Sequence, residues 1–321
     1  MKPKVKWYKL RWRVVGFVFL IILSVVGYAG WRFYNALRVR PMGDGPAGPP
    51  VAAAPFETVW SEKEVIFLGI GDSITRGYGG PGGLSYFNLL MQNHIQYPEM
   101  QCKDLSTVFP NLTARNVAVD YTISQEHIDR QLPKIPYYDE NVRGIIVLTS
   151  GGNDLIHDYG RSEPRHDAMY GCTYKQATEW CELLKQRLDT LLNGLMERFP
   201  SGCDIFFANI YDPTDGVGDP QTMMMHRWPA CVKTLALANQ KIAELCEKYP
   251  NVHLVDIHTL FLGHGIHCDE PWRKHYHKDD PTFWYAPILE DPNIRGHDAI
   301  RRLFLNEMIQ VYANESDAGS I

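Results

Sequence analysis

The hydrophobic pattern of the chain alternates between short apolar runs and longer amphipathic stretches. Short runs rich in β-branched residues and bounded by turn residues predict buried strands at residues 65–68, 114–119, 144–149, 204–210 and 252–257. Among these runs we expect helices over residues 84–96, 173–199, 230–248 and 298–312, the second with apolar spacing of about 3.6. Strands that alternate with helices predict an α/β fold, a parallel sheet covered by helices on both faces.

Residues 14–31 are an apolar run of another kind, 18 residues without a charge. Such a run is just long enough to cross a bilayer as a helix. Six basic residues precede it and three follow it, which predicts that residues 1–13 stay in the cytoplasm and the rest lies outside, periplasmic or extracellular. A cleaved signal peptide is the alternative, but its usual small-residue cleavage site does not follow at the right distance. We therefore expect an uncleaved single-pass anchor.

The segment after the apolar run is rich in Gly, Pro and Ala, above all at residues 41–55. Such a composition is typical of a semi-extended linker that does not pack into a core. We therefore expect a linker over residues 32–60, a globular domain over residues 61–315 and a short tail at residues 316–321.

The charge is unevenly distributed along the chain. Residues 1–40 contain nine Lys and Arg residues and no acidic one, so the chain's 32 basic and 37 acidic residues leave 23 basic and 37 acidic after residue 40. An acidic main domain argues against a nucleic-acid partner. The seven Cys residues include no Cys-x-x-Cys motif, so neither a compact zinc site nor a redox motif is indicated.

Polar residues follow two of the predicted strands. Ser73 comes after the first strand, and Asn153 comes after the strand at residues 144–149. The carboxyl ends of parallel strands meet at one edge of a sheet, where ligands bind. The Ser73 hydroxyl is therefore a candidate nucleophile, and the Ser73 N–H and the Asn153 amide are candidate donors to an oxyanion. An ordinary turn at Ser73 and a capping role for Asp154 are the alternatives.

Two short motifs carry a resemblance to a known family. Gly71-Asp-Ser-Ile74 and Gly151-Gly-Asn-Asp154, about 80 residues apart, resemble the first and third blocks of the GDSL/SGNH hydrolases. The segment at residues 292–297 resembles the one that flanks that family's C-terminal catalytic block. The resemblance covers roughly residues 64–313. It implies a three-layer, flavodoxin-like α/β/α sandwich with a five-stranded parallel sheet, and serine-dependent hydrolysis or transfer of acyl groups without a cofactor or metal. It also implies that Ser73 is the nucleophile and Asn153 an oxyanion donor.

The chain departs from the family pattern in two places. The family's second block usually offers a Gly N–H to the oxyanion, but here the equivalent position is Asp120 or Tyr121, whose backbone N–H can still donate. The family's last block is Asp-x-x-His-Pro-Asn, and in this chain Asp291 stands where the His is expected. An ordinary Asp is a weak base at pH 7, so a serine nucleophile needs another base within reach.

The C-terminal third of the chain is rich in His, and two of these residues are candidates for the missing base. We prefer His264, which has a Gly on each side, with Asp291 orienting it as in a catalytic triad. His297, at the start of the last helix, is the alternative base. The His-rich loop at residues 267–280 is interpreted as a substrate-facing or solvated insertion rather than a metal site.

The leading hypothesis is a membrane-anchored serine esterase, an acyl esterase or deacetylase. Its substrate would be an ester-bearing small molecule, lipid or polysaccharide. An O-acyltransferase acting on envelope polysaccharide is a second hypothesis with the same fold. A non-catalytic binding domain that has lost its catalytic His is the third.

Overall fold

The larger part of the chain is built on one five-stranded sheet. The computed structural model describes residues 5–286 and 290–318. Its strands are β1 (Glu64–Gly71), β2 (Leu112–Asn116), β3 (Val142–Thr149), β4 (Cys203–Ala208) and β5 (Val252–Val255). All neighbouring strands are parallel, and their order is β2-β1-β3-β4-β5. The expected five-stranded parallel sheet is therefore present, with the strand order typical of a flavodoxin-like fold.

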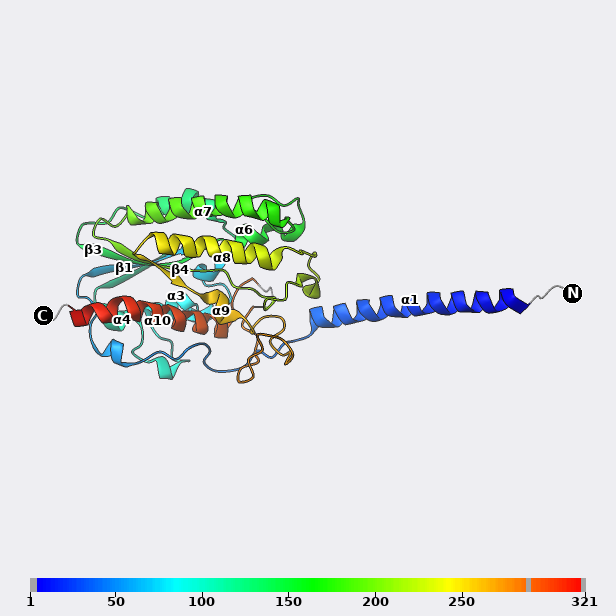
Figure 1. Ribbon diagram of the computed structural model, residues 1–321. Helices are drawn as coiled ribbons and strands as arrows, with labels where there is room; N and C mark the ends of the chain where they lie inside the picture. The colour runs from blue at the N-terminus through cyan, green and yellow to red at the C-terminus, as the bar shows by residue number, and fades with distance from the viewer. Residues whose placement is uncertain (1–4, 287–289, 319–321) are drawn as a thin grey trace. The chain divides into compact units, whose positions relative to one another are not determined.

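Helices cover both faces of the sheet. The helices of these two layers include α3 (Tyr86–Met91), α7 (Tyr174–Met196), α8 (Cys231–Lys248) and α10 (Ile294–Ala318). Helices α7 and α8 lie on one face, and α3 and α10 lie on the other (Figure 1). Short helices complete the unit: α2 (Ser73–Arg76), α4 (Leu105–Val108), α5 (Ser124–Glu126), α6 (Gly152–Ile156) and α9 (Ile257–Phe261). The three-layer α/β/α architecture expected from the sequence is thus confirmed.

The chain also forms several short helical turns, most of them of the 3-10 type. They are η1 (Ala54–Glu57), η2 (Pro81–Gly83), η3 (Pro98–Met100), the π-type η4 (His127–Gln131), η5 (Leu132–Lys134), η6 (His157–Gly160) and η7 (Pro220–Met223). The predicted strand at residues 114–119 ends early, at Asn116. The reason is local: the Asn116 side chain donates to the Thr75 carbonyl and accepts from the Ala118 N–H, which turns the chain out of the sheet.

Helix α7 shows why the helices could be predicted from the sequence pattern. Thr173 caps α7, and Gln176 completes a capping box by accepting a hydrogen bond from the Thr173 N–H. The apolar stripe of α7 is buried at Ala177, Leu184, Leu188, Leu191 and Leu195, whereas Trp180, which belongs to the same predicted stripe, is half-buried. Burial of such a stripe stabilises a helix more than its intrinsic propensity does.

The described chain divides into two compact units, of which the first contains residues 1–39 with residues 219–227. Its main element is α1 (Val5–Leu37), which includes the predicted anchor at residues 14–31. Within it, Trp12–Leu37 is long and apolar enough to cross a membrane, by length and composition. The Arg32 side chain donates to the Gln221 carbonyl inside the same unit.

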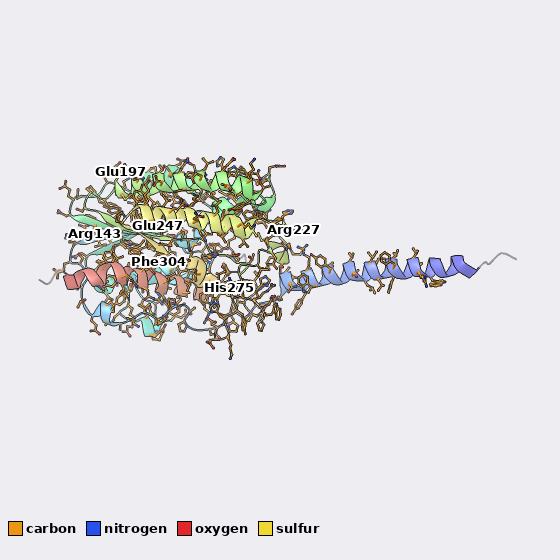
Figure 2. The ribbon with its side chains drawn as sticks, in the orientation of Figure 1. Arg143, Glu197, Arg227, Glu247, His275 and Phe304 are labelled. Atoms are coloured by element: carbon orange, nitrogen blue, oxygen red, sulfur yellow. The ribbon has the colours of Figure 1, made fainter. Side chains whose placement is uncertain are left out.

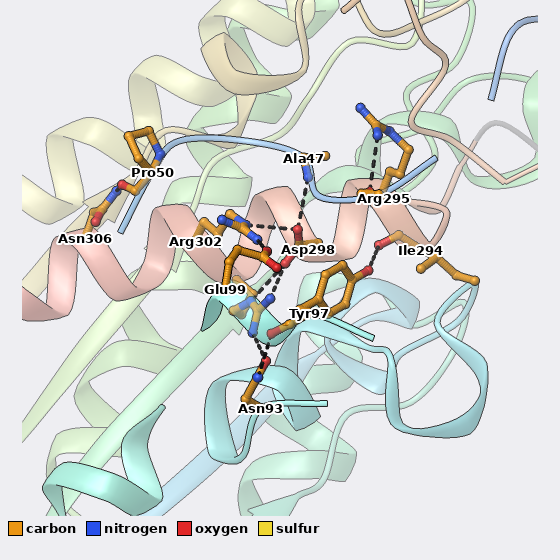
Figure 3. Close-up of polar contacts among 12 residues, drawn as sticks. Ala47, Pro50, Asn93, Tyr97, Glu99, Ile294, Arg295, Asp298, Arg302 and Asn306 are labelled. Atoms are coloured by element: carbon orange, nitrogen blue, oxygen red, sulfur yellow. Dashed lines mark hydrogen bonds and ion pairs between the residues drawn. The ribbon is translucent and has the colours of Figure 1, made fainter. Parts of the chain in front are cut away.

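The second unit begins earlier than the sequence suggested. Residues 40–51, which we call the strap, were expected to be part of a free linker, yet they pack along α10 (Figure 3). The Ala47 N–H donates to Asp298 Oδ2 at 3.0 Å, and the Arg295 side chain donates to the Asp44 carbonyl at 2.5 Å. Near the end of the strap, the Asn306 side chain donates to the Pro50 carbonyl. The expected boundary at residue 61 is therefore corrected to about residue 40.

The strap packs because its small residues permit a close approach to the helix. Gly48 has a φ of +88°, and a Cβ at this position would lie 2.6 Å from the Cα of Ala299. Ala47 and Val51 are buried. A Gly/Pro/Ala-rich segment therefore serves here as a packed strap, because small side chains let its backbone lie against the helix.

The amino and carboxyl ends of the strands lie at opposite ends of the second unit. Arg143, at the start of β3, and His275, in the loop after α9, mark these two ends (Figure 2). The loops that follow β1 and β3 leave the sheet at the carboxyl ends of these strands, as does the chain after β2. Ser73, Asn153 and the two alternatives Asp120 and Tyr121 lie in these three loops, at the edge where open α/β sheets bind their ligands.

Candidate active site

Ser73 stands at the end of the first strand. Strand β1 ends at Gly71, Asp72 caps α2 by accepting from the Ile74 N–H, and Ser73 is the first residue of that helix. The side chain of Ser73 remains partly exposed. Gly71 has a φ of +136°, and a Cβ there would lie 2.1 Å from the Thr149 carbonyl oxygen. A glycine is therefore required where β1 delivers Ser73 to the edge.

The loops after β2 and β3 meet beside this turn. The Val119 N–H donates to the Gly71 carbonyl, which brings Asp120 and Tyr121 to the same edge, where both are exposed. Asn153 is buried in α6, and its side-chain amide donates to the Thr122 carbonyl at 3.0 Å. The three loops predicted to carry the nucleophile and the oxyanion donors thus lie together.

Asp154 does more than cap a turn. Its buried carboxylate accepts from both the N–H and the hydroxyl of Ser124, at 2.9 and 2.6 Å. Arg187 of α7 lies 3.3 Å from the same carboxylate. The residue therefore ties the loop after β3 to the loop after β2, rather than serving only its own helix.

Asp291 is the ionisable group that meets Ser73. It lies just before α10, in a short antiparallel pairing in which the Ala286 N–H donates to the Asp291 carbonyl. Burial raises the pKa of the Asp291 side chain to about 6, a side-chain hydrogen bond with Ser73 lowers it, and the charge of Asp120 raises it. Its Oδ1 is buried and has no hydrogen-bond partner among the described residues. Residues 287–289, at the start of the same motif, lie outside the described residues.

Two more carboxyl groups surround this aspartate. Burial raises the pKa of Asp72 to about 7; a hydrogen bond from Thr149 lowers it, and the charge of Asp291 raises it further. Burial, and then the charge of Asp291, raise the pKa of Glu290 to about 7. We call Asp72, Glu290 and Asp291 the carboxylate cluster. Within the described part of the chain, none of the three forms an ion pair with a basic side chain.

His264 does not join this cluster. Its ring stacks on Trp284 with 3.4 Å between ring centroids, and its Nδ1–H donates to the Thr282 carbonyl at 3.0 Å. Burial lowers the pKa of His264 to about 4. Among the described residues, no hydrogen bond joins His264 to Asp291, so their expected pairing stays a prediction. The ring instead stacks on Trp284 and His277, while the Asp291 carboxyl group lies close enough to Ser73 for that side chain to lower its pKa.

His297, the alternative base, has a structural position. It is fully buried in α10, its Nε2–H donates to the Tyr78 carbonyl at 2.7 Å, and its Nδ1 accepts from the Tyr86 N–H at 3.2 Å. Burial lowers the pKa of His297 to about 4. Both ring nitrogens hold backbone groups of the segment between α2 and α3, so neither is available to Ser73.

Some residues of the site carried no sequence signal. Glu290 and Asp72 flank predicted site residues, but their burial beside a third carboxylate depends on contacts between distant segments. His127 and Gln131 are fully buried next to Gly71 and were not singled out at all. Among residues 5–286 and 290–318, no group of three or more His, Cys, Asp or Glu side chains is arranged to hold a metal ion.

Comparisons with known proteins identify the family of this chain. A sequence model of the GDSL-like lipase/acylhydrolase family matches residues 70–298. A search of curated proteins found no match.

Several solved structures are similar to this chain. An extracellular lipase from Streptomyces rimosus is 14% identical, with 76% of this chain and 99% of that chain covered and a TM-score of 0.47. A phospholipase A1 from Streptomyces albidoflavus is 15% identical, with coverages of 77% and 100% and a TM-score of 0.44. An acetylxylan esterase from Geobacillus stearothermophilus is 16% identical, with coverages of 77% and 95% and a TM-score of 0.46.

Proposed function

Because the chain belongs to the GDSL-like lipase/acylhydrolase family and is a hydrolase of ester bonds, we propose that Ser73 is its nucleophile and Asp291 its general base. The observation that supports this assignment is that the Ser73 side chain lies close enough to the buried Asp291 carboxyl group to lower its pKa. With a pKa of about 6, Asp291 is a stronger base than an ordinary Asp, whose pKa is about 3.9. A base so close to a serine hydroxyl activates it without a histidine.

The proposed reaction has two stages. In the first, the Ser73 hydroxyl oxygen bonds to the ester carbonyl carbon while its proton passes to the Asp291 carboxylate. The tetrahedral intermediate then expels the alcohol, which takes the proton from Asp291, and an acyl-enzyme remains. In the second stage, water attacks the acyl group as its proton moves to Asp291. The carboxylic acid then leaves, and Ser73 regains its proton.

The oxyanion of each tetrahedral intermediate needs hydrogen-bond donors in place. The Ser73 N–H, the Asn153 side-chain amide and the backbone N–H of Asp120 or Tyr121 are the proposed donors. Asn153 uses one amide N–H on the Thr122 carbonyl, which fixes the direction of the other. Removal of one such donor typically lowers kcat by about 10²–10³-fold.

The same proposal places the enzyme on a membrane. Helix α1 supplies an apolar span at Trp12–Leu37, preceded by basic residues that favour a cytoplasmic N-terminus and an extracytoplasmic catalytic unit. Only two residues, Arg38 and Val39, separate the end of this helix from the start of the strap. The substrate is an ester-bearing small molecule, lipid or polysaccharide on that side.

A mutation series with a pH profile tests the proposed roles. Ser73→Ala and Asp291→Asn should each lower kcat for a p-nitrophenyl ester by about 10⁴-fold, and the double variant should be hardly worse. The wild-type kcat/KM should rise with pH through about 6, because Asp291 must be ionised to accept the proton. His264→Ala is the matched control and should keep both kcat and this profile.

A fluorophosphonate probe separates this proposal from its rivals. Such a probe should label wild-type protein at Ser73 and leave Ser73→Ala unlabelled. Protein that folds but neither reacts with the probe nor hydrolyses esters would instead be a binding domain. Loss of activity in His264→Ala with an active Asp291→Asn would return the base to the histidine.

A further inference from the structure

A buried polar hub joins the three loops of the site, and its centre is the Thr122 side chain. The Thr122 hydroxyl lies 2.7 Å from the Val119 carbonyl, 3.0 Å from Gln131 Nε2 and 3.0 Å from His127 Nε2. Thr122 is 3% exposed, and both His127 and Gln131 are fully buried. Buried polar groups of this kind are rigid only when every donor and acceptor is matched.

Donor and acceptor counting assigns each proton in the hub. The single hydroxyl proton of Thr122 goes to the Val119 carbonyl, the shortest of its contacts. The hydroxyl oxygen must then accept from Gln131 and from His127, so His127 carries its proton on Nε2. His127 Nδ1 accepts in turn from the Ser150 hydroxyl at 2.9 Å. Burial lowers the pKa of His127 to about 3, so the ring stays neutral as this pattern requires.

The hub reaches the turn that carries the nucleophile. The Gln131 side chain accepts from the Gly71 N–H at 3.0 Å and donates to the Gly71 carbonyl at 2.8 Å. The Gln131 amide thereby holds both backbone polar groups of Gly71, two positions before Ser73. Gln131 belongs to the π-type turn η4, a rare local form that often marks functional positions.

The hub also reaches the proposed oxyanion donors. The Thr122 carbonyl accepts from the Asn153 amide, and Thr122 directly follows Asp120 and Tyr121 in the chain. Tyr121 has a φ of +63°, a conformation that a non-glycine residue adopts only when its neighbours hold it there. Thr122 thus contacts the end of the strand before Ser73, belongs to the second loop, and accepts a hydrogen bond from the Asn153 amide of the third loop.

We propose that Thr122 is a positioning residue of the active site, which uses its hydroxyl and carbonyl to set the oxyanion donors of the second and third loops against Ser73. This inference rests on the proposed function, because it presumes that Asn153 donates to the oxyanion. Thr122 itself does not touch the substrate. It compensates for the Gly that the chain lacks in the second loop, since a residue with a side chain at that position needs external support.

The test compares Thr122→Val with Thr122→Ser, which keeps the hydroxyl. Thr122→Val preserves the shape of the side chain but leaves the His127 and Gln131 donors without an acceptor. It should lower kcat for a p-nitrophenyl ester by about 10²-fold with little change in KM, because a misplacement of about 1 Å has that effect on rate. Thr122→Ser should recover most of the rate.

A double-mutant cycle with Asn153→Ala distinguishes positioning from general destabilisation. If Thr122 acts through Asn153, then Thr122→Val should lower kcat much less in the Asn153→Ala background than in the wild type. Should Thr122→Val fail to fold, Ser150→Ala takes its place, because it removes only the outermost hydrogen bond of the hub. It should lower kcat in the same non-additive way.

Two results would overturn the inference. One is a Thr122→Val protein, folded by circular dichroism, with the kcat of the wild type. The other is a kcat loss that multiplies fully with that of Asn153→Ala. Either outcome with an inactive Ser73→Ala would refute the role of Thr122 alone, whereas an active Ser73→Ala would refute the proposed function itself.

Discussion

Two buried aspartates, Asp298 and Asp291, lie at the two ends of one short segment and have opposite surroundings. Asp298 in α10 is 0% exposed and pairs with both Arg301 and Arg302, while it also accepts from the Ala47 N–H of the strap. Asp291 is 2% exposed and has no basic partner among the described residues. A buried carboxylate without a cation is unfavourable for stability, so its presence points to function.

The difference shows where the fold uses its buried cations. At the strap, Arg301 and Arg302 form ion pairs with the Asp298 carboxylate, which also accepts a hydrogen bond from the strap (Figure 3). At the carboxyl edge of the sheet, the carboxylate cluster has hydroxyl and backbone donors but no basic side chain among its described contacts. The first arrangement serves stability, and we propose that the second supplies a base near neutral pH. Sites of the second kind usually lower the stability of the fold that contains them.

Truncation within the strap should have the largest effect on stability. A protein that begins at residue 40 should fold like the full-length chain, whereas one that begins at residue 57 loses the burial of Val51 and Phe56. Burial of two such side chains contributes roughly 3–6 kcal/mol. Urea unfolding of the two truncated proteins measures the difference. Equal midpoints would mean that the strap is a passive linker after all.

Asp298→Asn should have the next largest effect. It leaves Arg301 buried without a counter-ion among the described residues and Arg302 paired with Glu99 alone, and breaking a buried ion pair typically destabilises a protein by about 3–5 kcal/mol. The kcat of the folded protein should stay unchanged, because Asp298 belongs to the strap contact rather than to the catalytic edge. Denaturant unfolding together with active-site labelling gives both quantities on the same sample.

Asp291→Asn should do the reverse, with loss of activity and a gain in stability. Because the folded-state pKa of Asp291 is raised from 3.8 to about 6, its contribution to stability is present below about pH 4 and is lost as pH rises through 6. Asn has no such loss, so at pH 8 the variant should be more stable by about 1–3 kcal/mol. Unfolding at pH 4 and pH 8 should show the gain only at the higher pH.

The smallest effect on catalysis is expected for His297→Gln. The variant removes two hydrogen bonds to the backbone of Tyr78 and Tyr86, which should lower stability by about 1–3 kcal/mol. Its kcat should remain close to the wild-type value, since the ring does not reach Ser73. A fall in kcat without a fall in the unfolding midpoint would contradict this assignment.

The elements could be predicted because their signals are local. The apolar run before Ser73 and the spacing of α7 each follow from residues near one another in the chain, and the strand order came with the family resemblance. Ser73 and Asn153 could be predicted as site residues in the same way, because each lies shortly after a strand. Asp291 was recognised as the residue in the place of the histidine, but the sequence favoured His264 as the base, a role that we propose for Asp291.

The remaining features depend on contacts between residues far apart in the sequence. Nothing near Asp291 shows that it meets Ser73, more than 200 residues away, or that His264 turns toward Trp284. Composition suggested a free linker where the strap is packed, because small residues suit both a flexible chain and a close contact with a helix. Periodicity depends on which residues are apolar. Whether a charge is buried, and beside which partner, depends on how the whole chain folds.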